Sequence, residues 1–410
     1  MLYLCYFGLR EPLVQTQVLP YLRQLVTGGV NVNLLTFEPR SIHEWPERER
    51  EKQKQELEGE GINWFWLPYH KRPSLPATAY DILAGACMAA RLARRYHLDV
   101  LHARAHVAMA MAMLARTLTE CRLVFDLRGL IAEEYADAGI WTEGSLPFRM
   151  VKRLERAGLR RANEIIVLTR RVRDWLIERG LASADKIEVI PCCVDLSRFN
   201  AHGETWPPAA QDRFEVVYAG SVTGLYMLEE MGRFFLEIKA RREDAFLRIL
   251  TVSGAQGAKD TLCRVGLKVE DFWVGAVAPA EVPLYLSRAR MGLSFRKPAF
   301  SQIAASPTKI AEYLAAGLPV VSNAGTGDTD ELLEGERLGV ILRDFSREGY
   351  ERAAGAALAL TGEPDIRARC MEAARRHFDM VKVGGERYRH VYARLKEREA
   401  KLPTISKASQ

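Results

Sequence analysis

Ser306 to Ser322 read Ser-Pro-Thr-Lys-Ile-Ala-Glu-Tyr-Leu-Ala-Ala-Gly-Leu-Pro-Val-Val-Ser, and this stretch decides the fold. Ser306 can cap a helix with its hydroxyl, and Pro307 suits the first helical position because its missing N–H costs nothing there. Gly317 can end the helix in a left-handed conformation, and the apolar residues 318–321 that follow suit a short buried strand. The stretch therefore predicts a helix that leads directly into a strand, as in an α/β protein.

One side of this predicted helix carries charge. Lys309 and Glu312 are three residues apart, so they lie on the same side of the first two turns. A helix N-terminus offers free N–H groups and the positive end of the dipole to a phosphate, and Lys309 adds a positive charge there. Glu312, one turn further on, can accept two hydrogen bonds from a ribose diol. These features favour a nucleotide diphosphate site; the alternative is an ordinary helix with an exposed Lys–Glu pair.

The stretch resembles the donor-site signature of glycosyltransferase family 4, a family of retaining enzymes with the GT-B fold. The resemblance rests on Ser306-Pro307-Thr308-Lys309 followed by Glu312-Tyr313-Leu314-Ala315-Ala316-Gly317-Leu318-Pro319-Val320-Val321. It implies that Glu312 binds the ribose of a nucleotide-sugar, UDP- or GDP-linked, and that basic residues and helix amides hold the diphosphate. The family often carries a second glutamate eight positions earlier, which contacts the donor sugar. This chain has Ala304 there, so the identity of the sugar stays open.

The order of the predicted elements indicates two α/β domains. A strand–helix–strand series begins at residue 2, a second begins at residue 215, and a polar, proline-containing stretch at residues 202–212 separates them. Val189-Ile190-Pro191 with Val194-Asp195-Leu196 resembles the segment that closes the N-terminal domain in the same family. We therefore expect the GT-B architecture, in which two Rossmann-like domains with parallel sheets face each other across a cleft. The expected parts are an acceptor-binding domain (1–200), a nucleotide-sugar-binding domain (213–378) and a last helix (379–401) that crosses back to the first domain.

Composition excludes several classes of protein. The chain has 410 residues, 48% of them hydrophobic and 27% charged, which argues against disorder. A net charge of +6 is modest for this length, so we expect no nucleic-acid partner. The seven cysteines contain no C-x-x-C pair and suggest reduced thiols in a cytoplasmic protein. The apolar runs are too short for a membrane span, and the first residues suggest a strand and not a secretory leader.

The other donor candidates follow predicted strands of the second domain. The turn at Gly220 and Ser221 can approach a phosphate through its backbone, and Arg296 and Lys297 shortly precede the predicted helix. In retaining GT-B enzymes, protein groups and not a metal ion neutralise the charge of the leaving diphosphate. For Arg296 and Lys297 the alternative is a solvated pair in a loop. The predicted donor-binding set is Gly220, Ser221, Arg296, Lys297, Ser306, Thr308, Lys309 and Glu312.

Asp328-Thr329-Asp330 permits a different hypothesis, because an Asp-x-Asp pair binds a metal and a nucleotide-sugar in the other large glycosyltransferase fold. A glycine turn followed by an acidic helix start explains these residues more simply. No neighbouring carboxylate or histidine completes a site for a hard metal ion. We therefore expect no metal and no other cofactor, since the nucleotide-sugar is a substrate.

Catalytic and acceptor candidates follow predicted strands of the first domain. We expect Asp126, Arg128 and His102 to be catalytic, because each ends or follows a strand and so faces the cleft. The run 125–129, with Glu133-Glu134 after it, resembles a subgroup of bacterial family 4 enzymes and begins a long predicted loop that extends to Gly144. The alternative is a structural ion pair between Asp126 and Arg128. The acceptor-binding candidates are Arg10, Glu11, Arg104 and His106.

The resemblance implies a metal-independent, retaining glycosyltransferase of the hexosyltransferase type. It would move a sugar from a nucleoside-diphosphate sugar to a saccharide or lipid-linked acceptor in bacterial-type glycan or polysaccharide biosynthesis. The alternatives are a GT-B nucleotide-sugar epimerase and a non-catalytic nucleotide-sugar-binding subunit. A basic stripe at helical spacing suggests one further partner, an anionic membrane surface. The enzyme would then be a peripheral protein on the inner face of the membrane. The alternative is an ordinary solvated helix face. The stripe comprises Arg149, Lys152, Arg153, Arg156 and Arg160.

Overall fold

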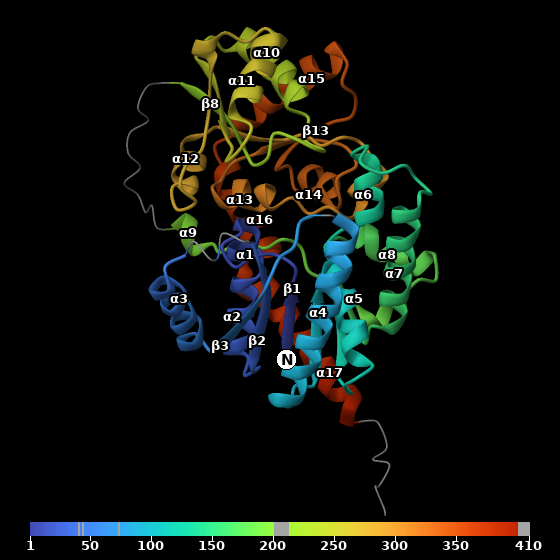
Figure 1. Cartoon of the computed structure of the whole chain (residues 1–410). Coiled ribbons are helices and arrows are strands. Elements are labelled where there is room, and N and C mark those ends of the chain that lie inside the picture. The colour runs from blue at the N-terminus through green and yellow to red at the C-terminus, as the bar shows by residue number, and fades with distance from the viewer. Residues whose placement is uncertain (40–41, 43–44, 73, 201–212, 401–410) are drawn as a thin grey trace, which may run out of the picture.

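A computed structural model describes residues 1–39, 42, 45–72, 74–200 and 213–400, which form two α/β domains (Figure 1). Within these residues the first domain contains a seven-stranded sheet in the order β3-β2-β1-β4-β5-β6-β7. The second contains a six-stranded sheet in the order β10-β9-β8-β11-β12-β13. All the paired strands named here run parallel, so the expected fold of two Rossmann-like domains is confirmed. The expected linker at residues 202–212 lies outside the described residues.

The strands are short, and the central ones are almost continuously buried, as expected of parallel sheets covered on both faces, whereas the strands at the sheet edges are partly exposed. Those of the first sheet are β1 (Leu2–Cys5), β2 (Val32–Glu38), β3 (Ile62–Pro68), β4 (Val100–Arg104), β5 (Arg122–Leu127), β6 (Glu164–Val167) and β7 (Ile187–Val189). Those of the second are β8 (Phe214–Ala219), β9 (Ala245–Leu250), β10 (Phe272–Gly275), β11 (Met291–Ser294), β12 (Val320–Asn323) and β13 (Gly339–Leu342). Because every ladder is parallel, the carboxyl ends of all strands in a sheet meet at one edge, where ligands bind in such folds.

Helices connect the strands and cover both faces of each sheet. In the first domain they are α1 (Pro12–Gln17), α2 (Leu19–Thr27), α3 (Glu47–Gly59), α4 (Ser74–Arg95), α5 (Ala105–Arg116), α6 (Ile131–Asp137), α7 (Leu146–Arg161), α8 (Arg170–Glu178), the short η2 (Ala184–Lys186) and α9 (Ser197–Asn200). In the second domain they are α10 (Leu228–Arg241), α11 (Ala255–Val265), η3 (Val269–Asp271), α12 (Val282–Arg288), η4 (Phe300–Ala304), α13 (Thr308–Ala315), α14 (Thr329–Gly335), α15 (Arg347–Thr361) and α16 (Ile366–Phe378). A π-helical turn, η5 (Met380–Gly385), leads into the last helix, α17 (Glu386–Ala400).

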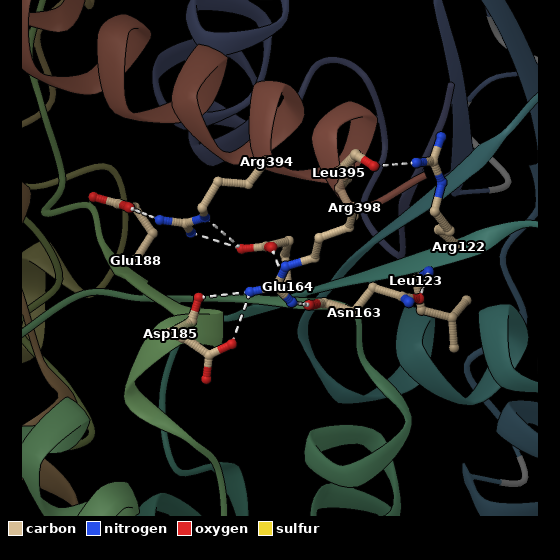
Figure 2. A network of polar contacts seen from close by, with 9 residues as sticks. All are labelled: Arg122, Leu123, Asn163, Glu164, Asp185, Glu188, Arg394, Leu395 and Arg398. Atoms are coloured by element: carbon tan, nitrogen blue, oxygen red, sulfur yellow. Dashed lines mark hydrogen bonds and ion pairs between the residues drawn. The ribbon is translucent and has the colours of Figure 1, made fainter. Parts of the chain in front are cut away.

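The last helix packs on the first domain although it follows the second in sequence. Tyr388, Val391 and Leu395 of α17 are buried with residues of α2, β1 and β2. Figure 2 shows the polar contacts beside this apolar seam, where Arg394 reaches the fully buried Glu164 of β6 at 2.6 Å. Arg394 also reaches Glu188 at 2.7 Å, and other residues of α17 contact Arg122, Asn163 and Asp185. The last helix therefore ties the two domains together.

Residues 306–322 fold largely as expected. The helix α13 buries Ile310, Tyr313 and Leu314, Gly317 follows it with a φ of +76°, and β12 comes next. The predicted cap is wrong, because Pro307 occupies the cap position and no side chain caps the helix. The Ser306 hydroxyl instead accepts a hydrogen bond from the backbone N–H of Cys192, at 3.1 Å, and so joins the two domains.

The long loop predicted after β5 is wrong in part. It contains the helix α6, which begins at Ile131 and packs against η4 of the second domain. The helix is only seven residues long, which is too short for a clear periodic pattern. Packing against the second domain therefore stabilises α6, because its local sequence alone would not do so.

Candidate donor site at the domain junction

The strand order of the second domain reverses at β8, which lies between β9 and β11. Open α/β sheets bind their ligands at such a switch point, outside the carboxyl ends of the strands. Gly220 directly follows β8, and Arg296 comes two residues after β11. The first turns of α13 bring Lys309 to the same place. The structure therefore gathers three of the predicted donor residues at the switch point.

Lys309 is buried and forms no ion pair with any described residue. Its side chain lies against two aromatic rings, with the Nζ atom 3.9 Å from the centre of Tyr218 and 4.2 Å from the centre of Tyr226. The residue is 7% exposed, and its Nζ atom has no hydrogen-bond partner among the described residues. The aromatic faces stabilise a cation, but they do not replace the hydrogen bonds that an ammonium loses on burial.

Gly220 makes room for this ammonium. Its φ of +137° is a conformation that residues with a side chain rarely adopt. A Cβ atom at this position would lie 2.8 Å from Lys309 Nζ. The glycine therefore allows both the turn and the position of the lysine, and it leaves backbone rather than a side chain beside the charge.

The environment of Lys309 disfavours its charge. Burial lowers the pKa of Lys309 well below its usual value, and the nearby Arg296 lowers that pKa further, while Glu312 opposes them. A bound anion would stabilise the protonated lysine, because opposite charges at short range favour each other strongly where water is excluded. The site therefore has the electrostatics of an anion site.

Arg296 and Glu312 flank Lys309. The Arg296 guanidinium lies 4.9 Å from the centre of the same Tyr226 ring, and its Nε–H donates to the Gln302 side chain. Glu312 is half-buried, and burial raises the pKa of its carboxyl group, while Arg198 and Lys309 oppose that rise. The described residues provide the Glu312 side chain with no hydrogen bond. Both predicted residues thus keep polar atoms available for a ligand.

The other predicted donor residues lie around this centre in different roles. Ser221 is exposed in the turn after Gly220, and Thr308 is half-buried at the start of α13. Lys297 is exposed, but its Nζ donates to the backbone carbonyl of Asp137 in the first domain, at 2.7 Å. Ser306 is used in the domain contact with Cys192. Lys297 and Ser306 therefore have partners from the first domain in this structure.

A cavity of about 720 Å³ opens on the other side of the first turn of α13. Residues of both domains line it, among them Thr169, Arg170, Ser306 and Pro307. Lys309, Arg296 and Glu312 do not line it. The candidate donor residues at the switch point therefore lie outside this cavity.

The three residues expected to be catalytic form an interior network. Asp126 is fully buried and receives hydrogen bonds from the hydroxyls of Tyr3 and Tyr388, at 3.3 and 3.2 Å. It also pairs with Arg128 at 3.4 Å, and His102 is fully buried 3.9 Å from it. Burial raises the pKa of Asp126, but Arg128, His102 and Arg104 outweigh burial and hold it well below its usual range. This placement favours the alternative of a structural ion pair, and the catalytic roles stay a prediction.

The acceptor candidates separate into two groups. Arg104 and His106 are buried, and they pair with Asp126 at 3.5 Å and with Glu155 at 3.0 Å. Arg10 and Glu11 are exposed in the loop after β1, where Arg10 pairs with Glu49 at 2.9 Å. Arg104 and His106 are both bonded inside the domain, although the Nδ1 atom of His106 has no hydrogen-bond partner among the described residues. Acceptor binding by Arg10 and Glu11 stays a prediction.

The acidic pair after β12 has structural partners. Asp328 accepts hydrogen bonds from the backbone N–H groups of Arg170 and Arg171, at 2.7 and 3.2 Å, and so joins the start of α8. Asp330 accepts one from the N–H of Gly325 at 2.8 Å. Within the described ranges, no group of three or more His, Cys, Asp or Glu residues is arranged to hold a metal ion. The residues present therefore do not fit a metal site at this pair.

Glu134 of α6 is a candidate that sequence reasoning missed. Its side chain is half-buried, and burial raises the pKa of its carboxyl group, while Arg296 of the second domain and His106 oppose that rise. One group from each domain therefore acts on this carboxylate. The sequence signal was the pair Glu133-Glu134, but only the position of α6 distinguishes the two residues.

Two family models match the chain. A model described as "Glycosyl transferase 4-like domain" matches residues 14–193, and one described as "Glycosyl transferase-like" matches residues 233–395. The two matches lie in the two structural domains. No curated protein sequence matches the chain.

Solved structures match over nearly the whole chain. Sucrose-phosphate synthase from Thermosynechococcus elongatus has a TM-score of 0.70 at 16% identity, covering 96% of this chain and 99% of its own. A glycosyltransferase from Rickettsia africae ESF-5 has a TM-score of 0.69 at 13% identity, covering 98% and 99%. Anabaena HepE, solved in complex with UDP and glucose, has a TM-score of 0.62 at 15% identity, covering 98% and 99%. At such low identity these likenesses show the fold alone.

Proposed function

The chain is a glycosyltransferase of the GT-B fold, since glycosyltransferase models match both of its domains, and from this premise we propose that it transfers a sugar from a nucleoside-diphosphate sugar, with retention and without a metal. The acceptor is a saccharide or a lipid-linked saccharide, as in bacterial-type glycan synthesis. UDP is the proposed nucleotide, because Anabaena HepE, whose fold this chain shares, was solved with UDP.

The observation that carries this proposal is the unpaired ammonium of Lys309 at the switch point of the second sheet. Arg296 and the backbone at Gly220 lie beside it, so a diphosphate placed there meets two cations and exposed peptide groups. Such groups stabilise the charge that develops on a leaving diphosphate. Glu312 lies one turn further along α13, at a suitable position for a ribose diol.

A panel of nucleotide-sugars tests the proposal. We expect the wild-type protein to release free UDP slowly from one UDP-sugar, and faster when its acceptor is present. A changed sugar without release of nucleotide would indicate an epimerase instead. Binding without any turnover would indicate a non-catalytic subunit, and no binding of any nucleotide would contradict the proposal.

Two controls identify the site and the role of metal. Glu312→Ala should weaken UDP binding by about 1.5–3 kcal/mol, the contribution of hydrogen bonds to a charged group, in a calorimetric titration. Addition of a chelator should leave turnover unchanged. If manganese or magnesium restored an activity lost in chelator, the metal-free part of the proposal would fail while the donor site could stand.

We also propose that the first domain contacts an anionic membrane through α4 and α7. These helices pack on either side of α5, and Figure 1 shows all three at one side of the first domain. Arg149, Arg153, Arg156 and Arg160 of α7 are exposed, and none has an ion-pair partner in the described part of the chain. Lys152 differs from the expected stripe, because it is half-buried and pairs with Glu133 at 2.6 Å and with Glu155.

The charge and apolarity of this face support a lipid partner. The only acidic residues of α4 and α7, Asp81 and Glu155, are both fully buried. Large apolar side chains accompany the arginines, including Leu146, which is 62% exposed, and Leu83, which is 60% exposed. Arginines attract anionic headgroups and exposed leucines can enter the interface. None of the helices within the described ranges is long and apolar enough to span a bilayer.

A further inference from the structure

The helix α6 of the first domain is fastened to the loop that carries Arg296. Asp137, the last residue of α6, accepts a hydrogen bond from the backbone N–H of Ser301 at 3.1 Å. Its own backbone carbonyl accepts a hydrogen bond from Lys297 Nζ at 2.7 Å. Both donors lie within five residues of Arg296, so α6 holds a set position beside the donor site.

Glu134 lies one turn before Asp137 on this helix, on the same side. Its side chain bends back over Gly129, where a Cβ atom would collide with the carboxylate. The described residues offer this carboxylate no hydrogen bond and no ion pair. By contrast, the neighbouring Glu133 pairs with Lys152 at 2.6 Å. Glu134 is therefore a half-buried carboxylate that forms no ion pair within the described part of the chain, so its oxygens can accept hydrogen bonds from a ligand.

Glu134 is influenced by one group of the donor site and by one group of the first domain. Arg296 and His106 both oppose the rise that burial causes in the pKa of Glu134. Arg296 shares the Tyr226 ring with Lys309. Arg296 therefore connects Lys309, with which it shares a ring, to Glu134, on which it acts. A nucleotide-sugar complements these groups, because its anionic diphosphate suits the two basic side chains and its sugar hydroxyls suit a carboxylate.

The position where the family often carries a sugar-contacting glutamate lies elsewhere in this chain. Ala304 is 2% exposed and is buried among core residues of the first domain. It ends η4, the element on which α6 packs. Ala304 is therefore closed to a ligand, whereas the half-buried Glu134 lies on the helix that packs against η4.

We propose that Glu134 binds hydroxyl groups of the donor sugar, supplying from the first domain the carboxylate that is missing at Ala304. This inference rests on the proposed function, since it presumes a nucleotide-sugar with its diphosphate at Lys309 and Arg296. A carboxylate accepts hydrogen bonds from two sugar hydroxyls, and its burial makes them strong. Because the carboxylate comes from the opposite domain, the sugar is held only when α6 is docked on η4.

Two isosteric variants test this role. Glu134→Gln removes the charge from the proposed sugar contact, and Glu133→Gln makes the same change one residue away, where the partner is Lys152. We expect Glu134→Gln to bind UDP within twofold of wild type, because the diphosphate site is untouched. We expect it to release UDP at least tenfold more slowly from the UDP-sugar that wild type turns over. Glu133→Gln should keep both values near those of wild type.

The possible outcomes separate the inference from the proposed function. A Glu134→Gln variant with the wild-type release rate would overturn the inference and leave the function intact. Loss of UDP binding in this variant, with an unchanged melting temperature, would also overturn it, because Glu134 would then support the phosphate site. If the variant melts early, Glu134→Asp, which keeps the charge, should fold and show an intermediate rate; a full rate would contradict the proposal. A wild-type protein that binds no nucleotide would overturn both.

Discussion

The Lys309 ammonium lies 3.9 Å from the centre of the Tyr218 ring, and no anion accompanies it among the described residues. Aromatic rings and a glycine turn surround it, so the charge is held in place but not neutralised. A buried charge without a partner is costly, and proteins keep such groups mainly where a ligand completes them. This relationship supports the proposal that a diphosphate binds beside Lys309.

Lys309→Met should keep the apolar contacts with both rings while it removes the charge. We expect UDP to bind about tenfold to a hundredfold more weakly, because a hydrogen bond to a charged group contributes about 1.5–3 kcal/mol. Calorimetric titration at fixed ionic strength measures this change. Lys268→Met, at an exposed lysine of the second domain, serves as the control and should bind UDP as wild type does. Unchanged affinity in Lys309→Met would exclude the diphosphate site proposed here.

The same lysine predicts how UDP binding depends on pH. Burial lowers the pKa of Lys309 in the free protein, and the diphosphate of UDP should raise it again. Binding therefore takes up a proton, and affinity should fall as the pH rises through the lowered pKa. Titrations in two buffers with different ionisation enthalpies measure the proton uptake directly. Lys309→Met should lose that uptake, whereas an uptake that persists in the variant would assign it to another group.

Asp126→Asn should reveal whether the interior network of the first domain is structural. The variant leaves Arg104 and Arg128 without their carboxylate, which should cost about 3–5 kcal/mol of unfolding free energy. Because the pKa of Asp126 is lowered on folding, its stabilisation is present above the unfolded value of 3.8 and is lost as the pH falls below it. The stability difference between wild type and variant should therefore shrink from pH 6 to pH 3. A stable variant with normal UDP affinity and slow turnover would favour the catalytic role instead.

Arg394→Ala tests the connection made by the last helix. The variant leaves the buried Glu164 with Arg398 alone, at 3.5 Å. We expect a loss of about 3 kcal/mol of unfolding free energy, the lower end of the cost of leaving a buried charge unpaired. Arg375→Ala removes an exposed pair with Glu372 and should cost less than about 1 kcal/mol. Equal melting temperatures for the two variants would show that the apolar seam of α17 suffices.

The membrane face predicts salt-sensitive binding to vesicles. Wild type should sediment with anionic liposomes, remain in solution with neutral ones, and be released by high salt, because each arginine near the surface contributes about 1 kcal/mol that salt screens. Reversal of Arg149, Arg153 and Arg156 to Glu should abolish sedimentation. Reversal of three exposed basic residues of the second domain, Lys259, Arg264 and Lys268, serves as the control and should preserve it. If equal amounts of wild type stayed in solution with anionic and with neutral vesicles, the membrane proposal would fail and a soluble acceptor would be favoured.

The two-domain α/β fold and the centre of the candidate donor site could be predicted from local patterns in the sequence. Strands and helices could be predicted because apolar periodicity and end signals such as Gly317 act within a few residues of the chain. Lys309 and Glu312 could be selected because helical spacing places them on one side of α13. These properties depend on residues that are close together in the sequence, so they could be predicted without knowledge of the rest of the structure.

Only the tertiary structure decided which polar groups are buried, paired or free. His106 and Lys152 resemble free site or surface residues in sequence, but Glu155 binds both of them inside the first domain. Ser306 resembles a helix cap, but the backbone of Cys192 occupies its hydroxyl. Glu134 gained its place only when α6 docked on the second domain. The physical reason is that burial and pairing depend on residues far apart in sequence, whose charges meet only after the two domains and the last helix have packed together.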